Sequence, residues 1–272
     1  ALEEMRARMA FSEWSSIQVS SLRKLGFQVA DKSVARVLVE LHNQRAFDAG
    51  LVLVGTLGYM ACLNEVGAIA VASRTLDVDL ARRQQLRLGV LRPFLDTMHA
   101  TGLPFVAVPG FPSSAPSTSV KLPGVQGLRV DVLAPGSVLG AAVSVPELQW
   151  TAQAVPFYDY LLDETEPGAM LAGNQCIPIR LPQAARFVWH KLYSSTQRRG
   201  FPEKAAKDQQ QALVLGAVLA ETDPAALRHA CEVAPAAMLG PVKPFLDTLV
   251  RRTSGHPELS DILHDCLGSD RS

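Results

Sequence analysis

Three segments decide the fold: LVLVGT at residues 51–56, RTLDVDLA at 74–81 and RVDVLAP at 129–135. The first is a short β-branched run closed by Gly55, which predicts a buried strand that turns directly into a helix over 56–66. In the second, apolar and acidic residues alternate, which predicts a strand with both carboxylates on one face. The third segment is also typical of a strand. Together they indicate a middle part of the chain in which strands and helices are mixed, within a chain of the α+β class.

The segments on either side of this part have helical character. Residues 12–47 have helical character: the apolar spacing within 34–41 mostly fits one helix face, and Asp31 or Ser33 is the expected cap. From residue 183 onward the pattern is helical almost throughout. The expected C-terminal helices span 183–198, 203–221, 223–232, 235–252 and 257–267. We therefore divide the chain into an N-terminal helical segment (1–50), a mixed α/β domain (51–182) and an α-helical C-terminal domain (183–272).

Weaker patterns fill the rest of the middle domain. A helix is expected over 84–101, broken at Pro93, and short extended pieces are expected at 69–71 and 106–108. The prolines within 177–182 predict an edge strand there.

The composition excludes several classes of protein. The 272 residues are 48% hydrophobic and 19% charged, enough for a folded core without disulfides or structural metal. Lys plus Arg and Asp plus Glu number 26 each, so the chain lacks the strongly basic signature of a dedicated nucleic-acid binder. The four cysteines lack the spacing of zinc ligands, which predicts reduced thiols and a cytoplasmic location. The longest apolar stretch, 51–63, is too short to span a bilayer, so we expect no membrane segment.

Three carboxylates lie in apolar, strand-like runs: Asp77, Asp79 and Asp131. Burial of each is costly without a partner. If the third strand pairs beside the second, the carboxylates converge and repel one another, and a divalent cation is the usual remedy. Mg²⁺ (or Mn²⁺) prefers carboxylate and phosphate oxygens, and two such ions activate an attacking oxygen and stabilise a leaving one. An Asp-x-Asp pair alone is typical of a solvated strand edge, so the third Asp is what favours a metal site.

The step Gly55-Thr56 ends a strand and opens a helix. Backbone N–H groups and the positive end of a helix suit a phosphate there, and the Thr56 hydroxyl adds a donor. Arg74 and Thr75, just before Asp77, are further candidates for phosphate binding. With the carboxylates, these residues predict a metal-bound nucleoside triphosphate as ligand.

These motifs resemble those of the nucleotidyltransferase superfamily, which includes polymerase β and the CCA-adding enzymes. That superfamily carries a Gly-Ser or Gly-Gly step, an Asp-x-Asp pair and a third Asp on a later strand. Here the corresponding residues are Gly55-Thr56, then Asp77 and Asp79, then Asp131. The resemblance implies a nucleotidyltransferase-like mixed sheet with flanking helices.

The closer resemblance is to a bacterial family of largely uncharacterised nucleotidyltransferase-fold proteins, distantly similar to abortive-infection toxins of the AbiEii type. That family similarly shows a Val-Gly-Thr step, a Thr-x-Asp-Val-Asp run and a Val-Asp-x-Leu strand. It also has a His-Lys-Leu helix and a Lys-Asp-x-x-Gln-Ala segment, which 190–192 and 207–212 match here. The resemblance covers most of residues 45–220.

The resemblance implies an enzyme that moves a nucleoside monophosphate from an NTP to an acceptor hydroxyl and releases pyrophosphate. Asp77 and Asp79 are then expected to hold both metal ions. Asp131 is expected to bind the metal next to the acceptor and to help deprotonate its hydroxyl. The acceptor is an RNA 3′ end, a protein side chain or a small alcohol, and the toxin-like relatives, which modify tRNA, make RNA one of these options. No oligomeric state is implied.

Three lysines of the helical part are predicted to bind the nucleotide: Lys191, Lys204 and Lys207. The alternative for Lys191 is a solvated helix face. The alternative for Lys204 and Lys207 is a helical ion pair with Asp208, which follows at helical spacing.

Two other functions fit parts of the pattern. The first is a catalytically silent nucleotide-binding or regulatory module on the same fold, because a fold does not by itself imply activity. The second takes Asp77-Val78-Asp79 as the nucleophile pair of a HAD-type phosphatase. That motif normally lies near the start of a chain, and the second reading leaves Asp131 and Gly55-Thr56 unexplained.

Overall fold

The computed structural model describes residues 2–71, 75–89, 93–110, 112–198 and 200–268. The chain divides into two units. The first, which we call the sheet unit, comprises Ala1–Tyr158 and Thr165–Leu181. The second, the helical unit, comprises Asp159–Glu164 and Pro182–Ser272. Each is described by itself.

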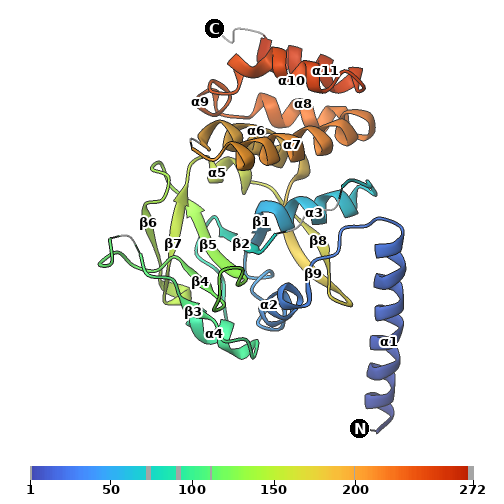
Figure 1. Cartoon of the computed structure of the whole chain (residues 1–272), viewed down its shortest axis with the longest axis vertical. Helices are drawn as coiled ribbons and strands as arrows, with labels where there is room; N and C mark the ends of the chain where they lie inside the picture. The colour runs from blue at the N-terminus through green and yellow to red at the C-terminus, as the bar shows by residue number, and fades with distance from the viewer. Residues whose placement is uncertain (1, 72–74, 90–92, 111, 199, 269–272) are drawn as a thin grey trace. The chain divides into compact units, whose positions relative to one another are not determined.

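The sheet unit is built on a mixed sheet of seven strands (Figure 1). Five of them follow the order β1-β2-β5-β4-β3, with the bounds Leu51–Val54, Asp77–Arg82, Arg129–Pro135, Ser119–Lys121 and Val106–Ala107. Strand β7 (Trp150–Val155) pairs with β5, and β6 (Ala142–Val145) pairs with β7. The pairs β2–β5 and β5–β7 are parallel and the others are antiparallel, so the predicted mixed sheet is confirmed.

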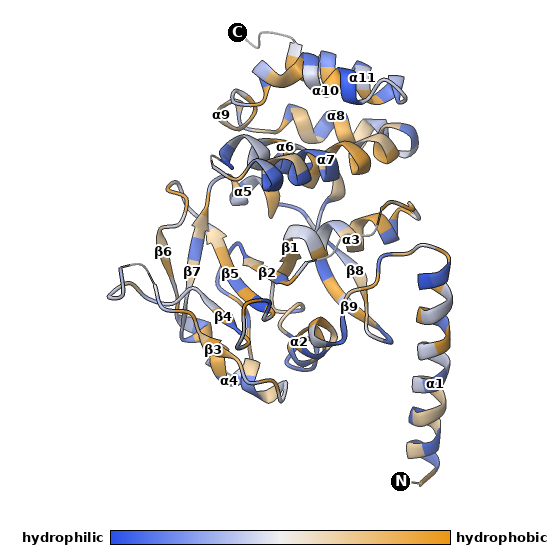
Figure 2. Cartoon of the chain, viewed as in Figure 1, coloured by the Kyte–Doolittle hydropathy of each residue, from blue (hydrophilic) through white to orange (hydrophobic). Residues whose placement is uncertain are grey.

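The strands form where the sequence alternates. Val78 and Leu80 of β2 and Val130 and Val132 of β5 are fully buried, and the polar residues between them lie on the other face. Figure 2 accordingly shows β5 as an apolar strand with a hydrophilic band. All four residues of β1 are buried, because that strand is covered on both faces.

The described part of the sheet unit contains the helices α1 (Leu2–Lys24), α2 (Lys32–Asn43), α3 (Gly55–Glu65) and α4 (Phe94–Ala100). Helix α3 follows β1 without a loop, as predicted, and is buried from Thr56 to Leu63.

The helical character predicted over 12–47 is confirmed as two helices, and Asp31, one of the two predicted caps, occupies the N-cap of α2. The chain leaves the helical conformation after Lys24, and Gly26 has a φ of 97°, a left-handed value that glycine tolerates best. A Cβ at Gly26 would overlap the side chain of Ile69, so a contact distant in sequence holds this turn.

The predicted helix over 84–101 is shorter than expected. Only Phe94–Ala100 is helical, and no helix is present over 84–89; residues 90–92 lie outside the described part. Pro93 occupies the N-cap, where a residue without an N–H group is tolerated. No strand forms over 69–71.

A separate hairpin completes the sheet unit. Strands β8 (Thr165–Ala172) and β9 (Gln175–Pro182) form a two-stranded sheet, in which β9 confirms the predicted edge strand. The Glu65 carboxylate at the end of α3 accepts a hydrogen bond from the Ala169 N–H at 2.6 Å, which ties β8 to that helix.

The helical unit carries the helices that the C-terminal sequence predicts, with one long helix replaced by shorter ones. The helices are α5 (Tyr158–Leu161), α6 (Ala184–Gln197), α7 (Pro202–Thr222), α8 (Pro224–Glu232), α9 (Ala236–Leu239), α10 (Leu246–Arg252) and α11 (Pro257–Leu263). The predicted helix over 235–252 is interrupted at Pro241 and Pro244, because proline removes a helical hydrogen bond. Trp189 is fully buried, and its Nε1 donates to the Leu227 carbonyl at 2.9 Å.

Among the described helices, none combines the length and the apolar character needed to cross a membrane. In the described part of the chain all four cysteines are free thiols, and three of them are buried.

Candidate active site

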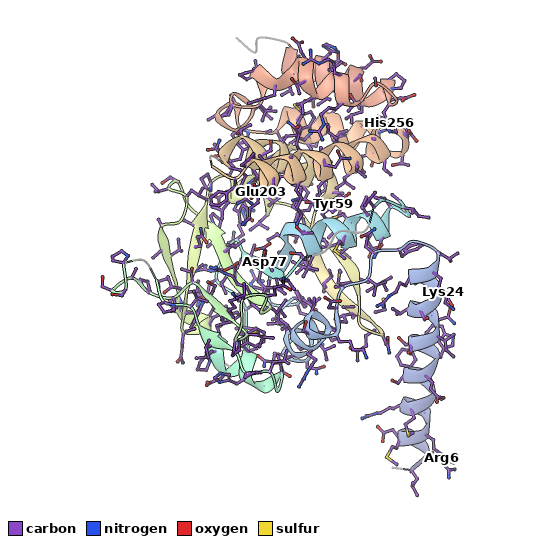
Figure 3. The ribbon with its side chains drawn as sticks, in the orientation of Figure 1. Arg6, Lys24, Tyr59, Asp77, Glu203 and His256 are labelled. Carbon is purple, nitrogen blue, oxygen red and sulfur yellow. The ribbon has the colours of Figure 1, made fainter. Side chains whose placement is uncertain are left out.

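The two strands that carry the acidic motifs lie side by side. Strands β2 and β5 are parallel and in register, so that Asp79 is the partner of Asp131 and Asp77 is the partner of Arg129. Neighbouring strands are about 4.8 Å apart, and residues two positions apart share a face. The structure therefore brings Asp77, Asp79 and Asp131 to one face of the sheet, where Asp77 is exposed (Figure 3).

The step from β1 into α3 lies against this face. In the antiparallel pair β1–β2, Val54 is the partner of Asp79, and Gly55 follows it with a φ of 66°. A Cβ at Gly55 would overlap the Asp79 carboxylate. Glycine is required here for two reasons: the left-handed backbone conformation, and the lack of room for a side chain beside Asp79.

The first turn of α3 thus begins beside the carboxylates. The N–H groups of a first helical turn lack partners within the helix and carry the positive end of its dipole. Thr56 is the second residue of this turn and is largely buried, with 9% of its surface exposed. This end of α3 can donate hydrogen bonds to an anion.

Arg129 occupies part of the same face. Its Nε donates to Asp131 Oδ1 at 2.8 Å, and its Nη2 donates to Ser119 Oγ at 2.6 Å. Ser119 belongs to β4, where it is the register partner of Asp131. Sequence reasoning gave Arg129 no role, although its position two residues before Asp131 on one strand predicts that their side chains share a face.

The protonation of Asp131 reflects these neighbours. Burial raises the pKa of Asp131 above its usual value, and the negative charge of Asp77 acts in the same direction. The charge of Arg129 and the hydrogen bonds from Arg129 and Ser119 lower it, but not enough to cancel burial.

Thr75 holds the start of β2. Its Oγ1 accepts a hydrogen bond from the Asp77 N–H at 3.2 Å, so its hydroxyl supports the backbone of an acidic residue. Arg74, the other predicted phosphate ligand of this segment, lies outside the described residues.

The acidic face has the donor chemistry of a magnesium site. Mg²⁺ is usually held by one or two carboxylates together with substrate phosphates, and all three side chains offer oxygen. Yet no three His, Cys, Asp or Glu residues among those described are arranged to hold a metal ion by themselves. Since Arg129 engages Asp131, the arrangement fits a cation at Asp77 and Asp79 that phosphate oxygens help to bind.

The three predicted lysines lie in the helical unit. Lys191 on α6 is buried, and its Nζ donates to Asp208 Oδ1 at 3.0 Å, so the alternative of a solvated face is wrong for it. Arg198 Nε donates to Asp208 Oδ2 at 3.1 Å. Lys204 is exposed on α7, with its Nζ 5.5 Å from the centre of the Phe201 ring, and Lys207 is on the same helix.

Asp208 is therefore held by two cations, Lys191 from the middle of α6 and Arg198 at its C-cap. Burial alone would raise its pKa, but the charges and hydrogen bonds of Lys191 and Arg198 outweigh burial and hold the pKa below its usual value. This carboxylate stays ionised.

Comparisons with known proteins identify the family of this chain. A family model described as Nucleotidyltransferase matches residues 32–235, three quarters of the chain. The chain matches none of the curated proteins with which it was compared. Among solved structures, an antigenic nucleotidyltransferase-like protein from Paracoccidioides brasiliensis is similar at 17% identity and a TM-score of 0.42, over 87% of this chain and 96% of that one. By the extent of the family match, the chain belongs to this nucleotidyltransferase family.

Proposed function

We propose that the protein is a magnesium-dependent (or manganese-dependent) nucleotidyltransferase that moves a nucleoside monophosphate from an NTP to a hydroxyl. The observation that carries the proposal is the register of β2 and β5, which aligns Asp79 with Asp131 beside the start of α3 at Gly55. The family match supports it. Acidic oxygens for a cation and N–H donors for a phosphate then lie side by side.

Each residue has a proposed part in the transfer. Asp77 and Asp79 would hold the cations, which when bound neutralise charge on the triphosphate. Asp131 would share in that binding and accept the proton of the acceptor hydroxyl, whose oxygen bonds to the α-phosphorus as the bond to the pyrophosphate oxygen breaks.

The remaining residues would bind the nucleotide. Gly55 and Thr56 would donate N–H groups, and Thr56 its hydroxyl, to phosphate oxygens. Arg74 and Thr75 are proposed as further phosphate ligands. The three lysines, Lys191, Lys204 and Lys207, are proposed to meet the triphosphate. For Lys191 this contact competes with the ion pair to Asp208.

The acceptor is proposed to be an RNA 3′ end, a protein side chain or a small alcohol. The protein is also proposed to be bacterial and similar to toxin–antitoxin components, because it shares motifs with the bacterial nucleotidyltransferase-fold family described above. A cytoplasmic location is supported by the free thiols of the described cysteines.

The test is incubation with each α-labelled NTP and Mg²⁺ or Mn²⁺, with total RNA or total protein as acceptor. We expect label on one acceptor and release of pyrophosphate. Asp79→Asn should lower the rate by about 1,000-fold, since it removes a charged oxygen at the centre of the site. Asp96→Asn, an exposed change on α4, is the matched control and should leave the rate unchanged. Absence of transfer with every NTP would contradict the proposal.

A silent nucleotide-binding module remains the second candidate, and one observation favours it. Arg129 engages Asp131, and the described residues form no three-residue metal cluster. Equilibrium dialysis with the same labelled NTPs separates the two functions, because binding without transfer would select the silent module.

A further inference from the structure

Helix α1 presents most of its surface to solvent. It has 23 residues, which at 1.5 Å per residue is about 35 Å of helix. Of these residues only Val19 is buried, and residues 2–14 are all exposed. The helix is therefore covered by the sheet unit only along its second half.

Large apolar side chains lie on its exposed surface. Phe11, Trp14 and Ile17 follow one another at three-residue spacing, and Leu25 continues the same side just after the helix. We call these four residues the α1 stripe. Between 57% and 66% of each is exposed, and the rings of Phe11 and Trp14 are 5.8 Å apart. Several large apolar side chains exposed along one side of a helix normally mark an interaction site, and Figure 2 shows the apolar bands along α1.

The charges of α1 point to its partner. The first turn is acidic, with Glu3 and Glu4, and the last turn is basic, with Arg23 and Lys24 (Lys24 is labelled in Figure 3). An antiparallel copy of the same helix places each acidic turn beside a basic one and opposes the two helix dipoles. Trp14 lies near the middle of α1, so a twofold axis there places Phe11 of one copy beside Ile17 of the other. The same axis places Lys24 and Leu25 beside the first turn of the other copy.

We propose that α1 is an antiparallel homodimerisation helix, in which the α1 stripes of two copies pack together. Phe and Trp bury about 150–250 Å² each, so the two stripes together bury roughly 1,000 Å². That is the low end for a specific interface. The dimer is accordingly concentration-dependent, with a Kd on the order of micromolar.

Sedimentation equilibrium of the full chain between about 0.5 and 100 μM tests the proposal. We expect a monomer–dimer equilibrium for the unaltered protein. The double variant Phe11→Ser, Trp14→Ser should raise the Kd by more than about 100-fold, because it removes the aromatic centre of the interface. Val125→Ser, which changes a side chain 95% exposed outside the stripe, is the matched control and should leave the Kd unchanged. Circular dichroism verifies that each variant keeps its helix content.

A charge exchange tests the antiparallel orientation. Lys24→Glu should weaken the dimer about tenfold, since two equivalent contacts become repulsive. Adding Glu3→Lys should restore it. We choose Glu3 because Glu4 already pairs with Arg8 within the helix. A monomer at every concentration, a dimer that ignores the stripe variant or a charge exchange without rescue would each overturn the proposal.

Discussion

Two carboxylates of this chain, the half-buried Asp131 and the buried Asp208, differ in their electrostatic surroundings. The Asp131 carboxylate accepts a hydrogen bond from one cation, Arg129, and shares its sheet face with Asp77 and Asp79. Beside Asp208 the described residues supply two cations, Lys191 and Arg198, for a single carboxylate. Burial pushes the pKa of both groups upward, and only at Asp208 do the neighbours reverse the direction. The surroundings of Asp131 thus favour its protonated form relative to an ordinary carboxylate, whereas those of Asp208 favour its ionised form.

The largest expected effect is on the stability of the folded chain. Asp208→Asn should lower the free energy of unfolding by about 3–5 kcal/mol, because it leaves the buried ammonium of Lys191 without its counter-ion. Urea unfolding followed by circular dichroism measures the loss. Asp131→Asn is the matched variant. It should lower the free energy of unfolding by less than about 1 kcal/mol, because burial already disfavours the charged form of Asp131. Equal losses for the two variants would break the comparison.

Removal of the positive charge of Arg129 from the sheet face should strengthen the binding of a metal cation there. Arg129→Gln is expected to strengthen the binding of Mn²⁺ or Mg²⁺ about tenfold, since it frees a carboxylate oxygen of Asp131 and removes a nearby positive charge. Isothermal titration calorimetry with the metal alone measures the affinity. Arg129→Lys keeps the charge and should stay close to the unaltered protein. A lower affinity in the glutamine variant would show that Arg129 supports cation binding and does not compete with it.

The smallest expected effect is in the pH dependence of stability. The pKa of Asp208 is lower in the folded chain than in the unfolded one, so its contribution is complete above the unfolded value and is lost as the pH falls through the folded value. The pKa of Asp131 is raised, so the folded state binds its proton first and stability increases as the pH falls through that raised value. Unfolding free energies between pH 3 and 7 should therefore change slope oppositely in Asp208→Asn and Asp131→Asn. Parallel profiles would contradict the two directions.

The elements around the acidic face could be predicted because each has a strong local pattern. Leu51–Val54 is short and apolar, and the alternation in β2 and β5 sets which side chains share a face. The breaks in the helices were harder to predict. The turn at Gly26 depends on Ile69, which lies more than forty residues away.

The acidic residues of the candidate site could be predicted from the sequence, but the cations that pair with them could not. The alternation placed Asp77 and Asp79 together, and only the pairing of strands brought Asp131 and Arg129 to them. Lys191 resembles a solvated lysine in the sequence, because its burial depends on the packing of α7 against α6. Local patterns indicate where a side chain points, whereas its neighbours come from tertiary structure.

The left-handed Gly55 has a consequence for how this protein can change. The Asp79 carboxylate occupies the space that a side chain at residue 55 would need, so a single added methyl group both strains the left-handed backbone and displaces that carboxylate. Mutational drift at this position cannot alter the strand-to-helix junction while it leaves the acidic face alone. Selection for the fold and selection for the acidic face therefore act on the same residue, Gly55.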